Sequence, residues 1–241
     1  MASADKLEKS ISTIKYFLFC LDVVTFGLGL TVFGLSLWLW WEDEFSDIID
    51  YLDIYLIYWG LYLIMLKAVL VIFVSFFACA SALLENTVFL FINSIAQLVL
   101  FVLGLLGAAV LLTFTSVGSA TQSTINSSMV NLITYYPQND WANGRLSFIQ
   151  ENVGCCGGSG GPNDYVNRWK PLPTECRDSV TGNAFFYGCA EEVTWYLEGR
   201  CYWITGLTLV LCFFHVINSV LSFILLQSIR KEEEESGGRY N

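Results

Sequence analysis

Charged side chains are scarce in this sequence of 241 residues. Asp, Glu, Lys and Arg together make up 14% of the chain, where a soluble globular domain carries roughly a quarter. Hydrophobic residues make up 55%, and the few charges fall in short blocks between long apolar runs. This distribution excludes an ordinary soluble domain and predicts an integral membrane protein.

Basic residues and histidine are scarcer still. The chain has 12 Lys and Arg against 22 Asp and Glu, for a net charge of −10. No basic stripe is available to neutralise phosphates, which argues against nucleic acid as a partner. The single histidine, His215, lies inside an apolar run. Because the sequence also lacks a Gly-rich phosphate loop, a nucleophile elbow and metal-spaced ligands, we predict no enzyme activity and no metal site.

Four apolar runs exceed the ~20 residues that a helix needs to cross the hydrocarbon core. The predicted transmembrane helices are residues 14–40, 56–84, 87–113 and 202–229. The segments outside them are 1–13, 41–55, 85–86, 114–201 and 230–241. The first run is too long for a signal peptide and lacks a small-residue cleavage site, so we expect it to remain as an anchor.

The distribution of basic residues predicts the orientation. The N-terminal tail holds Lys6, Lys9 and Lys15, and the C-terminal tail holds Arg230, Lys231 and Arg239, whereas the segment 41–55 is acidic and has no Lys or Arg. By the positive-inside rule both termini are cytoplasmic. We therefore expect a multi-pass plasma membrane protein with a small extracellular loop at 41–55, a cytoplasmic turn at 85–86 and a large extracellular loop at 114–201.

The large loop carries most of the motif information. Its apolar spacing at Leu146, Phe148, Ile149 and Val153 favours a helix. It also holds the adjacent pair Cys155-Cys156, followed by Cys176 and Cys189. Adjacent cysteines cannot easily bond each other, so each is expected to pair with one of the later two, and both such connectivities remain open. Cys201 is then left over: free, intermolecular or part of a different pairing.

Several of these features together resemble the tetraspanin family. They are the four-span frame, a short acidic first loop, Glu85-Asn86 in a tiny second loop, Cys155-Cys156-Gly157, a proline-containing lead into Cys176, and Gly188-Cys189. The resemblance implies an all-α integral membrane fold with four transmembrane helices and a disulfide-bonded, mainly helical large extracellular loop. It also implies the pairs Cys155–Cys189 and Cys156–Cys176, and a non-enzymatic scaffold that organises other membrane proteins and tetraspanins laterally.

Residues 149–152, 171–188 and 231–235 more narrowly resemble an invertebrate tetraspanin of smooth septate junctions. That resemblance implies a role in assembling epithelial cell-cell junctions. Two alternatives are a lipid- or sterol-binding membrane protein and a pore or barrier former. The short, cysteine-free first loop disfavours a claudin-like barrier.

Polar residues inside the predicted spans are functional candidates, because burying them in lipid is costly. Counting ~1.5 Å per residue from the span ends places Asp22, Gln97 and Asn218 in one layer, and Lys67 with His215 in a deeper one. We favour hydrogen bonds between helices, worth ~0.6 kcal/mol each. The alternative, implied by the resemblance, is a polar cavity for a lipid or sterol head group.

The remaining candidates concern partners, modification and packing. Tyr165, Trp169, Phe185 and Phe186 are either partner-binding anchors or the small core of the loop. The palmitoylation candidates are Cys79 and, less favoured, Cys20, and the glycosylation candidate is Asn126 in Asn126-Ser127-Ser128. Close helix approach is expected at Gly27 and Gly34 in the first span and at Gly104 and Gly107 in the third.

Overall fold

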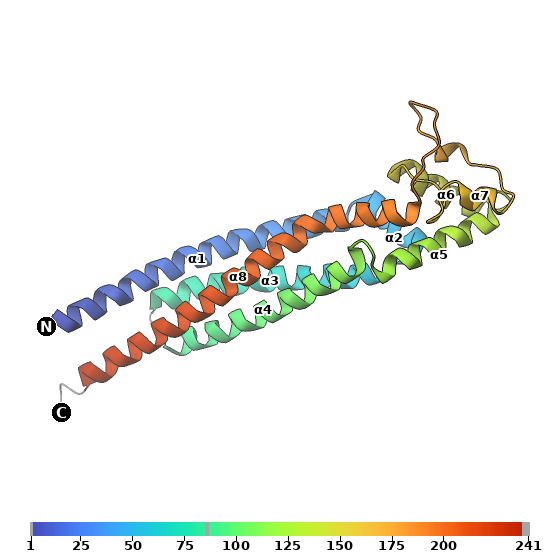
Figure 1. Ribbon diagram of the computed structural model, residues 1–241. Coiled ribbons are helices and arrows are strands. Elements are labelled where there is room, and N and C mark those ends of the chain that lie inside the picture. The colour runs from blue at the N-terminus through green and yellow to red at the C-terminus, as the bar shows by residue number, and fades with distance from the viewer. Residues whose placement is uncertain (1, 85–86, 238–241) are drawn as a thin grey trace. The chain divides into compact units, whose positions relative to one another are not determined.

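The computed structural model describes residues 2–84 and 87–237, so the turn predicted at 85–86 lies outside the described residues. Within those ranges every regular element is a helix. The β-type pairing there is limited to isolated bridges, Cys156 with Gly188 and Arg177 with Ala184. The elements are α1 (Ala2–Trp40), α2 (Asp43–Leu52), α3 (Leu56–Leu84), α4 (Thr87–Thr115), α5 (Ala120–Tyr135), α6 (Asp140–Val153), α7 (Asn163–Val166), a 3-10 helix (Thr174–Cys176) and α8 (Cys189–Gly237) (Figure 1).

Four of these helices are long and apolar enough to cross a membrane. They are α1, α3, α4 and α8, with candidate spans at Ile11–Trp40, Leu56–Ser81, Thr87–Thr115 and Cys189–Lys231. The predicted all-α, four-span fold class is confirmed. α8 begins well before the predicted span at 202, because Val193 and Leu197 give residues 189–201 a buried helical face.

The chain divides into two compact units. The first, which we call the bundle, comprises Met1–Ser36, Tyr62–Ala108 and Gly206–Asn241, and the second, the loop domain, comprises Leu37–Leu61 and Ala109–Thr205. In the bundle, α1 and α8 share an apolar cluster in which Ile11, Leu18, Leu225 and Ile229 are buried with Leu90 of α4.

Glycine allows close helix contact in the bundle, but at different positions in α1 from those predicted. A Cβ atom on Gly29 would lie 2.8 Å from the Val71 side chain, whereas nothing lies within 4 Å of Gly27 or Gly34. The prediction for Gly27 and Gly34 is therefore wrong. Sequence spacing identifies residues that share a helical face, but it does not tell which face meets the neighbouring helix. Gly104 and Gly107 of α4 do contact α3, at Lys67 and Ile64.

The acidic first loop contains a short amphipathic helix, α2, that the sequence analysis missed. Its four buried residues are Phe45, Ile48, Ile49 and Leu52. Their spacing of three, one and three residues is the signal that could have predicted it. α2 packs against α5 and α6, with Ser128 donating to the Leu52 carbonyl oxygen at 3.1 Å and Arg145 donating to the Tyr51 carbonyl oxygen at 3.2 Å. The carboxylates thus lie on the outer face of a folded element.

Both ends of α6 have capping residues. At the N-terminus, Asn139 Oδ1 accepts a hydrogen bond from the Trp141 amide at 3.0 Å, which satisfies an otherwise unpaired backbone donor. At the C-terminus Gly154 adopts a left-handed conformation, with φ of 75°, as glycine readily does at this position. The helix therefore ends at Val153, two residues before Cys155, so the chain turns where the disulfides begin.

Candidate functional site

Two disulfides form the centre of the loop domain. Cys155 is bonded to Cys189 and Cys156 to Cys176, with Cα atoms 4.9 Å apart in each pair. These are the pairs that the family resemblance implies. All four cysteines are fully buried, and the Cys156 amide donates to the Tyr187 carbonyl oxygen at 3.1 Å. The bonds join the end of α6 to the 3-10 helix and to the start of α8.

Gly157 follows the cysteine pair for a steric reason. Its φ is 66°, in the left-handed region, and a Cβ atom there would collide with the Gly161 carbonyl oxygen and lie 3.3 Å from Asp164 Cβ. Only glycine combines this conformation with such a close approach at low cost. The motif therefore encodes both the bonds and the turn after them.

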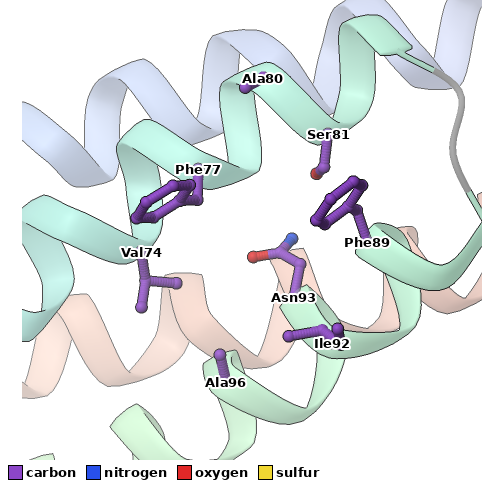
Figure 2. A pocket seen from close by; sticks show the side chains of 8 residues that line it. All are labelled: Val74, Phe77, Ala80, Ser81, Phe89, Ile92, Asn93 and Ala96. Carbon is purple, nitrogen blue, oxygen red and sulfur yellow. The ribbon is translucent and has the colours of Figure 1, made fainter.

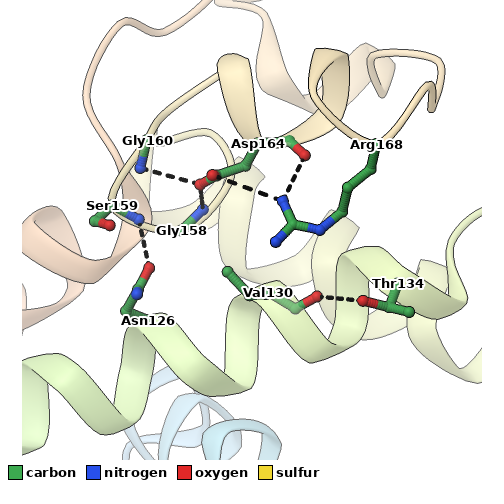
Figure 3. A network of polar contacts seen from close by, with 8 residues as sticks. All are labelled: Asn126, Val130, Thr134, Gly158, Ser159, Gly160, Asp164 and Arg168. Carbon is green, nitrogen blue, oxygen red and sulfur yellow. Dashed lines mark hydrogen bonds and ion pairs between the residues drawn. The ribbon is translucent and has the colours of Figure 1, made fainter.

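A polar network holds the turn that follows Gly157 against α5 (Figure 3). Asp164 Oδ2 accepts hydrogen bonds from the Gly158 and Gly160 amides at 2.8 and 3.0 Å. Asn126 Oδ1 on α5 accepts from the Ser159 amide at 2.7 Å. The glycosylation candidate thus helps to hold the turn, and its occupancy stays a prediction.

The four aromatic candidates have different environments. Tyr165 is fully buried, and its hydroxyl accepts a hydrogen bond from Gln150 Nε2 at 2.7 Å. Burial raises the pKa of Tyr165 above its usual range, so the hydroxyl stays protonated at neutral pH. Of the two interpretations left open for Tyr165, the structure supports the core, because the ring is fully buried on α7 (Asn163–Val166).

The other three aromatic candidates lie nearer the surface. Phe185 is half-buried, whereas Trp169 is 96% exposed and Phe186 is 86% exposed. Trp169 has a positive φ of 56°, which is uncommon for a bulky residue. The loop domain therefore exposes Trp169 and Phe186 and buries Tyr165.

Arg200 connects α8 to the segment that precedes α2. Its guanidinium lies 2.7 Å from Glu42 Oε1, and 5.1 Å above the Tyr196 ring centroid. Such a contact combines an ion pair with cation–π attraction. The sequence analysis missed it because the partners are far apart in the chain and no local pattern connects them.

The free cysteines differ in exposure. Cys201 is free and buried, so it takes part in no other pairing within this chain, and an intermolecular bond stays a prediction. Cys20 is exposed and Cys79 is half-buried. Palmitoylation of either one stays a prediction, and Cys20 is the more accessible of the two.

The polar residues of the bundle pair differently from the predicted layers. Asn218 Nδ2 donates to Asp22 Oδ1 at 3.0 Å, but Gln97 Oε1 accepts from His215 Nδ1 at 2.6 Å. Placing Gln97 with Asp22 was therefore wrong. Counting residues from the span ends assumes untilted helices with level ends, whereas transmembrane helices are commonly tilted.

Lys67 does not have His215 as its hydrogen-bond partner either. Its ammonium nitrogen donates to the Thr208 carbonyl oxygen at 3.3 Å and contacts Cys212 Sγ at 3.4 Å. All these polar side chains are at most 1% exposed. They join α8 to α1, α3 and α4, as the helix-to-helix interpretation requires.

An apolar cavity of about 440 Å³ lies between α3 and α4 (Figure 2). Its lining residues are Val74, Phe77, Ala80, Ser81, Phe89, Ile92, Asn93 and Ala96. The cavity falls within the size range of small-molecule pockets, and every lining residue belongs to a candidate span. Elsewhere in the described residues, no group of three or more His, Cys, Asp or Glu side chains is placed to hold a metal ion.

Comparisons with known proteins agree with this architecture. The sequence model of the Tetraspanin family matches residues 14–228. The chain is 40% identical to Tetraspanin-2A of Drosophila melanogaster over 98% of its own length and 96% of the relative's. It is 24% identical to a 23 kDa integral membrane protein of Schistosoma japonicum, over 69% of this chain and 71% of that protein. The family match includes all four apolar helices and the loop domain.

Proposed function

Because this chain belongs to the tetraspanin family of non-enzymatic, multi-pass membrane scaffolds, we propose that it gathers partner membrane proteins through the exposed apolar surface of its loop domain. Family members generally associate with other membrane proteins. Trp169 and Phe186 select the partner in this proposal. The function is lateral, non-covalent association in the membrane, and no covalent bond is made or broken.

The supporting observation is the contrast between the buried and exposed aromatics. Tyr165 and the four bonded cysteines belong to the buried core of the loop domain, whereas Trp169 and Phe186 lie outside that core. Aromatic side chains are enriched at protein interfaces, and Trp ranks among the residues most enriched at binding hot spots. The two residues are therefore available to a partner.

We further propose the orientation and location. Lys and Arg in both tails support cytoplasmic termini, and two disulfides support a loop domain that faces the oxidising extracellular space. The resemblance of residues 149–152, 171–188 and 231–235 to a smooth septate junction tetraspanin supports the plasma membrane at epithelial cell-cell junctions. In this orientation Cys20 and Cys79 lie toward the cytoplasmic side, where palmitoylation occurs.

Replacing Trp169 and Phe186 together by alanine tests the partner surface. Losing two hot-spot contacts of about 1–2 kcal/mol each should reduce recovery of partner proteins about tenfold or more, with normal surface expression. The measurement is proximity labelling from the loop domain in epithelial cells, followed by co-purification in mild detergent. Trp195→Ala is the matched control, since Trp195 is 56% exposed and lies elsewhere in the loop domain. If the double variant recovers the same partner proteins as wild type, the proposal is contradicted. If the wild-type protein is absent from cell-cell contacts, the junction assignment is contradicted.

A second candidate function is lipid or sterol binding, with the α3–α4 cavity as its site. The polar pairs of the bundle are bonded to one another and almost fully buried. The cavity between Phe77 and Phe89 instead provides an unfilled apolar volume within the spans. A lipid chain or sterol ring system has the matching chemistry, because its surface is apolar.

Filling the cavity should reduce this binding. Ala80→Leu with Ala96→Leu adds apolar volume at two lining positions, so crosslinking of a photoactivatable sterol should fall about fivefold, equivalent to ~1 kcal/mol. Ala109→Leu on the exposed side of α4 is the control for added bulk alone. Equal labelling of the cavity-filled and control variants would exclude this cavity as the site.

A further inference from the structure

The bundle contains a carboxyl group that is only half satisfied by hydrogen bonds. Asp22 on α1 is fully buried, as is Asn218 on α8. One hydrogen bond joins them, from Asn218 Nδ2 to Asp22 Oδ1 at 3.0 Å. The other polar atom of each group, Asp22 Oδ2 and Asn218 Oδ1, is buried without a partner. Leaving two buried polar atoms unpaired is costly, so a group that satisfies both oxygens would stabilise the pair.

A single hydrogen atom held between the two oxygens would satisfy both of them. An ionised carboxylate only accepts hydrogen bonds, and so does a carboxamide oxygen. When a carboxyl group and a carboxamide meet edge to edge, the first bond places the second pair of atoms side by side. A proton on the carboxyl group converts that second contact from two facing acceptors into a donor and an acceptor.

We propose that Asp22 binds a proton on Oδ2 and donates it to Asn218 Oδ1, which closes a cyclic acid–amide pair between α1 and α8. The step adds one proton and breaks no covalent bond. All four polar atoms of the pair are then satisfied, and α1 and α8 are joined by two hydrogen bonds without a net charge.

The surroundings of Asp22 support the neutral form. Lys67 donates to the Thr208 carbonyl oxygen and contacts Cys212, and His215 Nδ1 is bonded to Gln97. The Thr25 hydroxyl donates a hydrogen bond to the backbone carbonyl oxygen of Asp22, and it also contacts the Ser75 hydroxyl. None of these contacts supplies a positive charge to the Asp22 carboxyl group. A charge buried in a low-dielectric interior without a counter-charge is strongly disfavoured.

The other ionisable groups around the pair do not change this conclusion. Cys79 on α3 interacts electrostatically with Asp22, but a thiol cannot provide a cation. The stretch 87–108 of α4 contains no ionisable side chain. Besides Cys20 on α1 itself, the ionisable side chains are Lys67 and Cys79 in residues 63–84 of α3, and Cys212 and His215 in residues 206–229 of α8.

Because the pair binds a proton, the stability of the contact between α1 and α8 should depend on pH. While the proton is bound, both hydrogen bonds hold. When it is lost, a carboxylate faces a carboxamide oxygen, and one bond is replaced by repulsion. The stability of the α1–α8 contact should therefore fall as pH rises, and this dependence should disappear when residue 22 cannot titrate.

Three variants of the full-length protein in lipid nanodiscs test the pair. Asp22→Asn preserves a two-bond ring, with its own amide donating to Asn218 Oδ1, and its melting temperature at pH 7 should stay within about 2 °C of wild type. The exchanged variant, Asp22→Asn with Asn218→Asp, should behave likewise. Asp22→Leu leaves the Asn218 carboxamide without a partner and should melt about 5 °C lower. If Asp22→Asn melts as low as Asp22→Leu, the ring is overturned.

Infrared difference spectroscopy tests the proton directly. At neutral pH the wild-type protein should show the carbonyl absorption of a buried, protonated carboxylic acid. The band should be absent in Asp22→Asn and present in the exchanged variant. In the wild-type protein the band should disappear as pH is raised, and the melting temperature should fall with it. A spectrum that Asp22→Asn leaves unchanged would mean that Asp22 is ionised and paired with a bound cation, and the proposal fails.

Discussion

Replacing Cys156 and Cys176 together by alanine should destabilise the loop domain by about 3 kcal/mol, and replacing Cys155 with Cys189 by about 4 kcal/mol. The two bonds close loops with sequence separations of 20 and 34 residues, and a longer loop loses more entropy when it is closed in the unfolded chain. A loss of this size is a large part of the stability of a typical domain, and the amount of protein at the cell surface should fall several-fold.

Thermal unfolding and surface labelling measure this effect. The matched control is Cys201→Ala, because Cys201 is equally buried but unbonded. Its loss should cost about 1 kcal/mol and leave both disulfides resistant to alkylation. If the double variants unfold at the wild-type temperature, the bonds do not hold the domain together.

Tyr165→Ala should cost the loop domain about 3–5 kcal/mol, as for other large-to-small replacements of buried aromatics. Trp169→Ala, four residues away, should cost less than about 0.5 kcal/mol. Tyr165 is fully buried and Trp169 is 96% exposed, so the first change opens a cavity in the domain core and the second removes surface that already faces solvent. The pair of variants separates the two roles that the sequence left open for these aromatics.

Tyr165→Phe separates the ring from its hydroxyl. It keeps the packing and removes the hydrogen bond from Gln150 Nε2, which should cost about 1–2 kcal/mol. Calorimetry of the three variants should rank the losses as Tyr165→Ala, then Tyr165→Phe, then Trp169→Ala. A Trp169→Ala loss as large as that of Tyr165→Ala would show that Trp169 belongs to the core.

The four spans were predictable because a membrane imposes a length and a composition that can be counted along the chain. Local signals also predicted helices in the large loop, where Leu146 and Ile149 are buried as their spacing indicates. The helix α2 carried an equally clear signal at Phe45, Ile48, Ile49 and Leu52. It was missed because the acidic residues between these positions dominated the interpretation of that loop.

The sequence by itself determined the class of this protein: four apolar helices, a cysteine-rich loop between the third and fourth, and a glycine after the cysteine pair. These features depend on composition and on neighbours in the chain. Only the tertiary structure decided that Gln97 meets His215, that Gly29 rather than Gly27 meets α3, and that Tyr165 is buried while Trp169 is exposed. Each of these outcomes depends on the rotation and tilt of a helix, or on the path of a turn. Contacts between segments far apart in the chain set those quantities, and no local pattern of residues records them.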